Sequence, residues 1–161
     1  MLNKMIAKNY DLALFILRIT IGIVFFTHGS QKVLGFFGGQ GMVGTEEMFA
    51  KLGIPFPNLT AWVVGLSELV GGIALFIGFF TREFALLICA VMIGAIMTVT
   101  GKNGFFIMQQ GYEYNVTILA ACLCLFFAGG GGGSFDSLLF PKRRWEFIRD
   151  SSQIKLEPPE D

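Results

Sequence analysis

Residues 12–34 of the chain read LALFILRITIGIVFFTHGSQKVL, and this stretch decides the class of fold. Its length suits a helix that crosses a bilayer, which takes about 17 to 25 residues. A cleaved signal peptide is the alternative, but Arg18 interrupts the apolar run and no small-x-small cleavage site follows it. The stretch therefore predicts a retained membrane span.

Three further apolar stretches follow, at about residues 59–80, 84–99 and 116–128. The last two are short for a span and are expected to borrow flanking polar or glycine residues. Because backbone groups in lipid must bond within their own segment, the pattern predicts an all-α, polytopic membrane protein built as a four-transmembrane-helix bundle. Residues 1–140 are expected to form this domain, and residues 141–161 a basic juxtamembrane and disordered cytoplasmic tail.

The composition agrees with a membrane protein. Of the 161 residues, 53% are hydrophobic and 15% are charged, whereas a soluble domain carries about 25% charged residues. Lys plus Arg equals Asp plus Glu at 12 each, so the chain lacks the basic surplus of a nucleic-acid binder. One histidine and three cysteines without paired spacing predict neither a metal site nor a redox pair, and the cysteines are expected to pack in the core.

Two glycine-rich stretches look like phosphate-binding loops but lack the necessary context. Residues 39–44 match G-x-G-x-x-G, which binds dinucleotides only between a strand and a helix, whereas here it follows a membrane span. Residues 129–133 are five glycines with no Lys-Ser/Thr after them. We expect this run to end the fourth helix or to let another backbone approach closely.

Basic residues lie mainly on one side of the predicted spans, and this asymmetry predicts the orientation. The expected cytoplasmic side carries Lys4, Lys8, Arg82, Lys142, Arg143, Arg144, Arg149 and Lys155, whereas the other side carries Lys32, Lys51 and Lys102. Both termini are therefore expected in the cytoplasm, with the loops at about residues 35–58 and 100–113 outside.

Arg18, His28 and Glu68 lie inside the predicted spans, where a charge is costly and marks a function or an obligatory internal partner. The helix rise places Arg18 and Glu68 within one or two turns of each other in depth. We therefore expect an Arg18–Glu68 ion pair. Such a pair either serves the structure alone or holds a bound ligand.

A second polar cluster is expected near the outer face, around His28 and Glu113. Tyr112, Tyr114 and Asn115 lie beside Glu113 in the sequence, and Gln31 and Lys32 follow His28. Histidine changes protonation readily near neutral pH, so His28 and Glu113 could exchange protons with a quinone or hydroquinone that the neighbouring side chains bind. The alternative is that these groups satisfy one another and the helix ends.

Four other residues are expected to be structural. Arg82 and Asp136 lie at the ends of predicted spans. Gly71 and Gly72 lie within the second span, where small residues let helices approach closely in lipid.

Short motifs follow one another in a set order along residues 10–140. They are Leu17-Arg18 through Phe25, His28-Gly29 with Gln31-Lys32, Leu52-Gly53-Ile54-Pro55, Glu68-Leu69-Val70-Gly71-Gly72, Gly78-x-x-Thr81-Arg82, Gly111-Tyr112-Glu113-Tyr114 and Gly133-Ser134-x-Asp136. In order and spacing the sequence resembles the DoxX family of small four-span bacterial membrane proteins, which is grouped with the DoxD-like proteins.

The resemblance implies a four-helix bundle in the bacterial inner membrane and a link to redox chemistry. DoxD-like relatives are described as the membrane subunit of a thiosulfate:quinone oxidoreductase. Other members are associated with resistance to quinones or catechols, or with oxidoreductase assemblies that handle thiol and superoxide stress. The chain has no flavin, haem or iron–sulfur motif, so no intrinsic cofactor is expected and electrons would pass through a quinone or a partner subunit.

Three functions stay open. The first is a quinone-interacting subunit of a membrane oxidoreductase or a redox-stress resistance system. In it His28 and Glu113 would handle protons, and Arg18 and Glu68 would hold the site, with Gln31, Tyr112 and Tyr114 as further ligand contacts. The second is a non-catalytic scaffold or anchor for a partner protein, and the less favoured third is a small-solute carrier. The expected partners are the lipid bilayer, an oxidoreductase subunit and a second copy of the chain.

Overall fold

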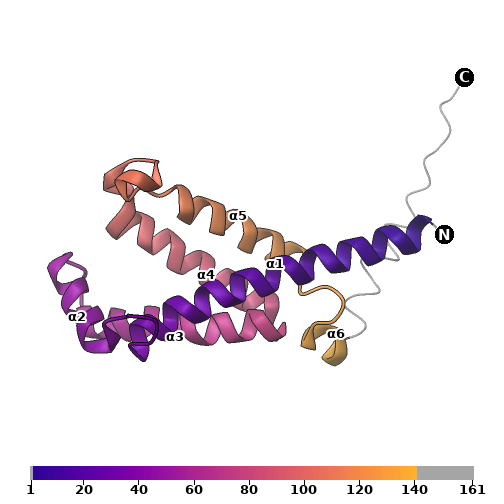
Figure 1. The fold of residues 1–161 in the computed structure, drawn as a ribbon, viewed down its shortest axis with the longest axis horizontal. Helices are drawn as coiled ribbons and strands as arrows, with labels where there is room; N and C mark the ends of the chain where they lie inside the picture. Colours follow the sequence, from indigo (N-terminus) through magenta and orange to yellow (C-terminus); the bar gives the residue numbers. More distant parts are fainter. Residues whose placement is uncertain (1, 141–161) are drawn as a thin grey trace, which may run out of the picture.

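The computed structural model describes residues 2–140, with side chains from residue 9 onward, and within this range it contains helices and no strand (Figure 1). The helices are α1 (Leu2–Val33), α2 (Gly41–Lys51), α3 (Pro57–Ile77), α4 (Thr81–Ala95), α5 (Glu113–Ala128) and α6 (Phe135–Leu139). A π-helix, η1 (Ile96–Thr100), and a 3-10 turn, η2 (Gly101–Asn103), continue α4, and η3 (Ile107–Gln109) lies in the next loop. The predicted all-α fold is confirmed, and the predicted tail lies outside the described residues.

Three of these helical segments are long and apolar enough to cross a membrane: Asn9–Val33, Pro57–Ile77 and Thr81–Asn103. The third is longer than the apolar run at 84–99, because η1 and η2 carry the helix on through polar and glycine residues. α5 is also apolar but has only 16 residues. The four predicted spans therefore correspond to three full-length spans and one short apolar helix.

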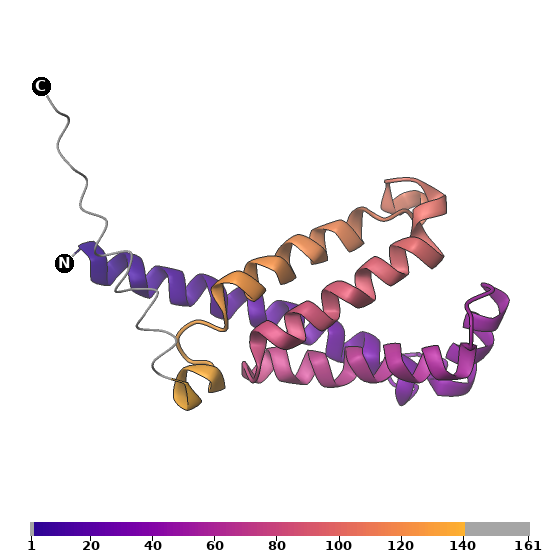
Figure 2. The same cartoon turned by 180° about the vertical axis from the view of Figure 1, so that it is seen from behind.

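The helices form two pairs that meet at one end of the molecule and diverge at the other (Figures 1 and 2). α1 packs antiparallel to α3, and α4 packs antiparallel to α5. We call the diverging end the α2 end and the opposite one the α6 end, after the short helix that lies at each. The main apolar core draws on α1, α3, α4 and α5, and its buried members include Phe25, Leu75, Ile88 and Leu125.

The contact between α1 and α3 is backbone-close, and glycines make it possible. A Cβ added to Gly22 would overlap the backbone of Phe76, and one added to Gly29 would overlap that of Leu69. Gly72 on α3 meets the α1 backbone in the same way. A step of seven residues along α1, from Gly22 to Gly29, moves the contact seven residues back along α3, from Phe76 to Leu69. The glycines therefore fix one antiparallel register.

The long loop at 35–58 contains α2, a helix that the sequence analysis did not predict. α2 begins at Gly41, within the G-x-G-x-x-G match, and no strand precedes it in the described chain. Its buried Phe49 packs with Ile54 and Ala61 in a small core of its own. The sequence analysis did not predict α2 because a helix this short carries only one row of apolar residues, which is a weak periodic pattern.

The five-glycine run ends α5 and then passes close to α1, so both expected roles hold. Gly129 caps α5 with φ 81°, and Gly131 and Gly133 also have positive φ, a conformation that favours glycine. The amide of Gly132 donates to Oδ1 of Asp11 at 2.7 Å. The run therefore ties the end of α5 to the first span.

Gly72→Ala is expected to destabilise the protein, because the added methyl overlaps the α1 backbone and forces the two helices apart. Overpacking of this kind costs about 1 to 3 kcal/mol of unfolding free energy. Gly94→Ala in α4 is the matched control, since a Cβ there meets nothing within 4 Å. The measurement is denaturant unfolding in detergent micelles, and equal stabilities of the two variants would contradict the close contact.

Candidate functional site

Polar side chains buried in the spans gather at two levels of the bundle. Arg18 lies toward the α6 end, whereas Glu68 lies toward the α2 end and pairs with Lys32. The expected Arg18–Glu68 pair is therefore wrong. The depth estimate counted residues from the predicted ends of each span. In the structure, the register set by Gly22 and Gly29 brings Glu68 level with the C-terminal end of α1 and leaves Arg18 beside the C-terminal end of α3.

Arg18 is only 1% exposed, and its guanidinium donates to backbone carbonyls. Nη1 reaches the carbonyl oxygens of Leu75 at 3.5 Å and Phe76 at 3.2 Å, and Nη2 reaches that of Gly133 at 3.3 Å. The last carbonyls of a helix have no partner within it. Arg18 thus closes the C-terminus of α3 and holds the glycine run against it.

Asp136 closes the beginning of α4 from the same side. Its carboxylate accepts hydrogen bonds from the amides of Phe80 at 2.7 Å and Thr81 at 2.8 Å, and its charge also acts on Arg18. Ser134 caps α6 by accepting from the amide of Ser137. The α6 end is accordingly a joint in which side chains cap helix termini, while Arg18 Nε and Thr81 Oγ1 are buried there with no hydrogen-bond partner among the described residues.

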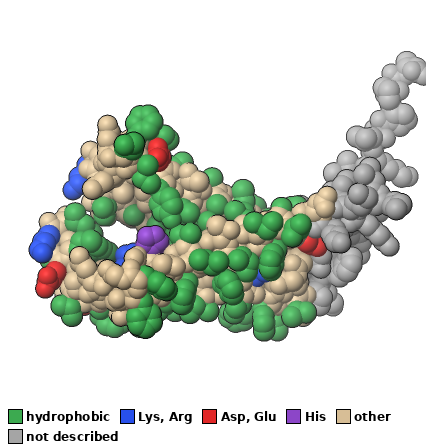
Figure 3. All heavy atoms as spheres, in the orientation of Figure 1, with side chains coloured by type: hydrophobic (Ala, Val, Ile, Leu, Met, Phe, Trp, Pro, Cys, Tyr) green, Lys and Arg blue, Asp and Glu red, His purple; other side chains and the backbone are tan. Residues whose placement is uncertain are grey.

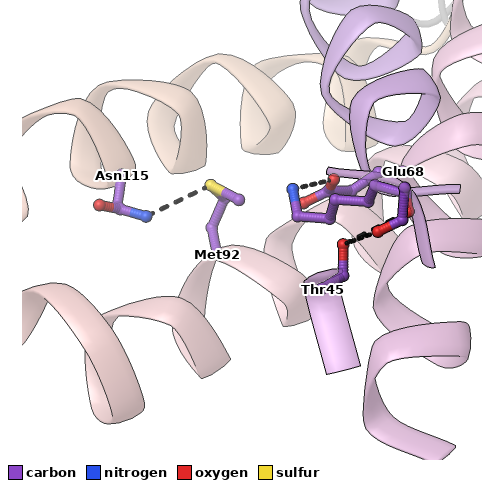
Figure 4. Close-up of polar contacts among 6 residues, drawn as sticks. Thr45, Glu68, Met92 and Asn115 are labelled. Carbon is purple, nitrogen blue, oxygen red and sulfur yellow. Dashed lines mark hydrogen bonds and ion pairs between the residues drawn. The ribbon is translucent and has the colours of Figure 1, made fainter. Parts of the chain in front are cut away.

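The ion pair between Lys32 and Glu68 is the centre of the second level (Figure 4). Nζ lies 2.5 Å from Oε2, and the Glu68 side chain is 5% exposed. Thr45 of α2 donates its hydroxyl to the carbonyl of Lys32 at 3.3 Å. The pair therefore joins α1 to α3, and α2 lies beside it through Thr45, whose shorter hydrogen bond of 2.8 Å is to the carbonyl of Gly41 in its own helix.

His28 and Tyr114 lie within the field of this ion pair. His28 is four residues before Lys32 and so shares its face of α1, and the charges of Lys32 and Glu68 both act on it. The charge of Glu68 also acts on Tyr114, which α5 contributes from the other helix pair. Among the described residues no contact joins His28 to Glu113. The carboxylate whose charge acts on the imidazole is that of Glu68.

Asn115 lies on α5 next to Tyr114, and its amide is 6% exposed. Nδ2 lies 3.5 Å from the sulfur of Met92 on α4, and Oδ1 accepts from the Thr100 hydroxyl at 3.2 Å. Thr100 belongs to the π-helix η1, and π-helical turns are frequent at functional sites. In Figure 4 Met92 stands on the side of Asn115 that faces the Glu68 ion pair.

The space-filling surface is hollowed between the two helix pairs at the α2 end (Figure 3). The chain's single histidine, with Lys or Arg beside it, borders this hollow. His28 is an exposed side chain, and Tyr114 is 37% exposed. The hollow thus gives a small molecule access to the imidazole.

The DoxX family model matches residues 13–101 of the chain. The chain belongs to the DoxX family. "Putative oxidoreductase CatD" of Bacillus subtilis (strain 168) is 31% identical over 85% of this chain and 94% of its own length. "Inner membrane protein YqjF" of Escherichia coli (strain K12) is 30% identical over 86% and 98%, and "Inner membrane protein YphA" of the same strain 31% over 76% and 87%. No solved structure matches.

Other residues singled out in this DoxX protein make contacts of their own. Gln31 donates to the carbonyl of Phe37 in the loop before α2, and Tyr112 packs edge-on against Phe105 at the start of α5. Two more occupy packing or surface positions: Gly71 lies against α4, and Arg82 is exposed. None of these contacts involves Glu68.

Cys89 and Cys122 come together between α4 and α5, and the Cys89 thiol donates to the carbonyl oxygen of Leu119 at 4.0 Å. The expectation that the cysteines pack in the core holds for these two, whereas Cys124 is exposed on α5. Both side chains are buried in the apolar core, at 4% and 0% exposure. Buried thiols in apolar surroundings are unreactive, so this pair packs the α4–α5 interface.

The Lys32–Glu68 pair can be tested with a double-mutant cycle. Lys32→Met or Glu68→Leu alone leaves the partner charge buried and unpaired, which costs about 3 to 5 kcal/mol. The double variant is expected to be far more stable than the sum of the single losses predicts. The measurement is unfolding free energy in detergent.

The exposed Lys51–Glu47 pair is the control for this cycle. Its atoms lie 4.0 Å apart with side chains 80% and 65% exposed, so its coupling should be about 0 to 1 kcal/mol. Additive losses at Lys32 and Glu68 would show that the two charges do not stabilise each other.

Proposed function

We propose that this DoxX protein binds a membrane-soluble quinone in the hollow at the α2 end and serves as the quinone-interacting subunit of a membrane oxidoreductase or redox-stress resistance system. The observation that carries the proposal is the buried Lys32–Glu68 pair, with His28 and Tyr114 in its field, beside an opening in the surface. The relative named as an oxidoreductase supports the general class of chemistry.

The residues around the hollow suit the chemistry of a quinone ring. A quinone offers carbonyl oxygens that accept hydrogen bonds, and the Lys32 ammonium, the His28 imidazole and the Tyr114 hydroxyl are donors. Reduction to a hydroquinone takes up two electrons and two protons. His28 can pass a proton to a ring oxygen. Glu113, at the first residue of α5, remains the predicted second proton carrier.

The hollow is also placed for a ligand that arrives through the lipid. It lies between two pairs of apolar helices, and their outward faces carry exposed side chains such as Phe26, Leu66 and Leu123. A lipid-soluble ring can therefore reach the opening without crossing water. The electrons would come from, or go to, a partner oxidoreductase subunit.

Quinone binding is tested with purified protein and a fully substituted 1,4-benzoquinone such as duroquinone, which does not add to thiols. Wild-type protein in nanodiscs is expected to bind it in equilibrium dialysis. His28→Ala should weaken binding about 3- to 10-fold, since it removes one hydrogen bond. Thr27→Ala is the control at the same depth, because the Thr27 hydroxyl donates a hydrogen bond to the carbonyl oxygen of Ile23 in its own helix. Wild-type protein that binds no quinone would contradict the proposal and favour the scaffold reading.

We further propose that the α6 end faces the cytoplasm. Most of the Lys and Arg residues lie in the segments that adjoin this end in the sequence, and such residues are in excess on the cytoplasmic side of a membrane protein. A green fluorescent protein fused after residue 161 should fluoresce, and alkaline phosphatase fused at the same place should be inactive. Active phosphatase would show the opposite orientation.

A further inference from the structure

We infer that the loop between η2 and α5 inserts the side chains of Phe106, Ile107 and Met108 into the lipid leaflet at the α2 end, so that their partner is the acyl chains just below the headgroups. We call this segment, residues 104–112, the η3 loop, after the 3-10 turn η3 within it. The inference goes beyond the proposed function, since it concerns the η3 loop and not the hollow.

The η3 loop turns its largest apolar side chains outward. Phe106 is 62% exposed and Met108 is 94% exposed, and Ile107 between them is also exposed. The sequence of the loop contains no charged residue, so burying these side chains in lipid carries no charge with it. Exposed apolar surface of this kind, made by neighbouring residues, marks contact with another molecule or with a membrane.

The backbone of the η3 loop makes many of its hydrogen bonds within the loop. The amides of residues 109–113 donate to carbonyl oxygens of residues 104–107 over distances of 2.8 to 3.1 Å. Gly111 allows this compact form, because an added Cβ would lie 2.2 Å from the carbonyl oxygen of Gly104. A loop whose polar backbone groups bond one another loses less on entering a membrane interface than one whose groups depend on water.

The loop lies at the level where the α4–α5 hairpin meets the edge of the bilayer. The amide of Glu113, the first residue of α5, donates to the carbonyl of Phe105 at 2.9 Å. Exposed apolar side chains flank the loop on both arms of the hairpin, at Met97 in η1 and Val116 in α5. Figure 3 shows hydrophobic side chains on the side of this end that faces away from the hollow. The lipid that surrounds the two arms therefore adjoins the loop.

The polar residues on either side of the apolar tip favour lipid over a protein partner. Lys102 is exposed just before the loop, and a lysine at this place keeps its ammonium among phosphate headgroups while its stem lies along apolar surface. Gln109 and Gln110 are exposed directly after Met108, and their uncharged amides can bond headgroup oxygens. This order of residues matches a segment that lies in the interface with its apolar side chains dipped into the acyl chains.

The experiment places a nitroxide spin label on single cysteines, with the protein in nanodiscs of phosphatidylethanolamine and phosphatidylglycerol. Collisions of the label are measured with oxygen, which concentrates in lipid, and with a polar nickel chelate, which stays in water. Cys124→Ser removes the exposed native thiol. Met108→Cys is the test position. Lys51→Cys on α2 is the control for water, since that side chain is 80% exposed and charged, and Leu123→Cys on the exposed face of α5 is the control for lipid.

The label at position 108 should collide with the nickel chelate about 10-fold less often than the label at position 51, because a polar complex is excluded from lipid. Its collisions with oxygen should approach those at position 123. Equal nickel collisions at positions 108 and 51 would overturn the inference, since the tip would then lie in water. Low collisions with both reagents would also overturn it, since a second copy of the chain would then cover the tip. Ile107→Cys gives the same reading if Met108→Cys does not fold.

Discussion

The close contact of α1 with α3 determines what each buried charge of this protein meets. Glycines on both helices let the two backbones touch, and only one register avoids a clash. In that register Lys32 lies opposite Glu68, and Arg18 reaches the last carbonyls of α3. Removing the contact would therefore change the polar interior at both levels at once, although the charges themselves are unaltered.

The two ends of the bundle differ in what their polar side chains contact. At the α6 end, Arg18, Asp136 and Ser134 cap helix termini and hold the glycine run in place. At the α2 end the helix pairs diverge, and the polar side chains border a hollow (Figure 3). A capped joint at one end and an open site at the other is an arrangement that suits ligand binding.

Hydropathy alone predicted the spans and the all-α fold, since lipid allows few alternatives. It also singled out Arg18, His28 and Glu68, because any charge in a span is conspicuous. The partners of these residues depend on helix register, which sequence spacing does not contain, so Arg18 was paired with the wrong residue. The contact of Cys89 with Cys122 was missed for the same reason. Thr100 owes its position to a π-helical turn, for which the residues before it give no clear signal.

The shortness of α5 has a consequence for the membrane around it. Its 16 residues span about 24 Å, against a hydrocarbon core about 30 Å thick. Such hydrophobic mismatch is relieved when the surrounding bilayer thins or the helix ends draw polar groups inward. Either response acts on the α4–α5 hairpin, which forms one wall of the hollow. A thinner or thicker host membrane is therefore expected to act first on this wall of the hollow.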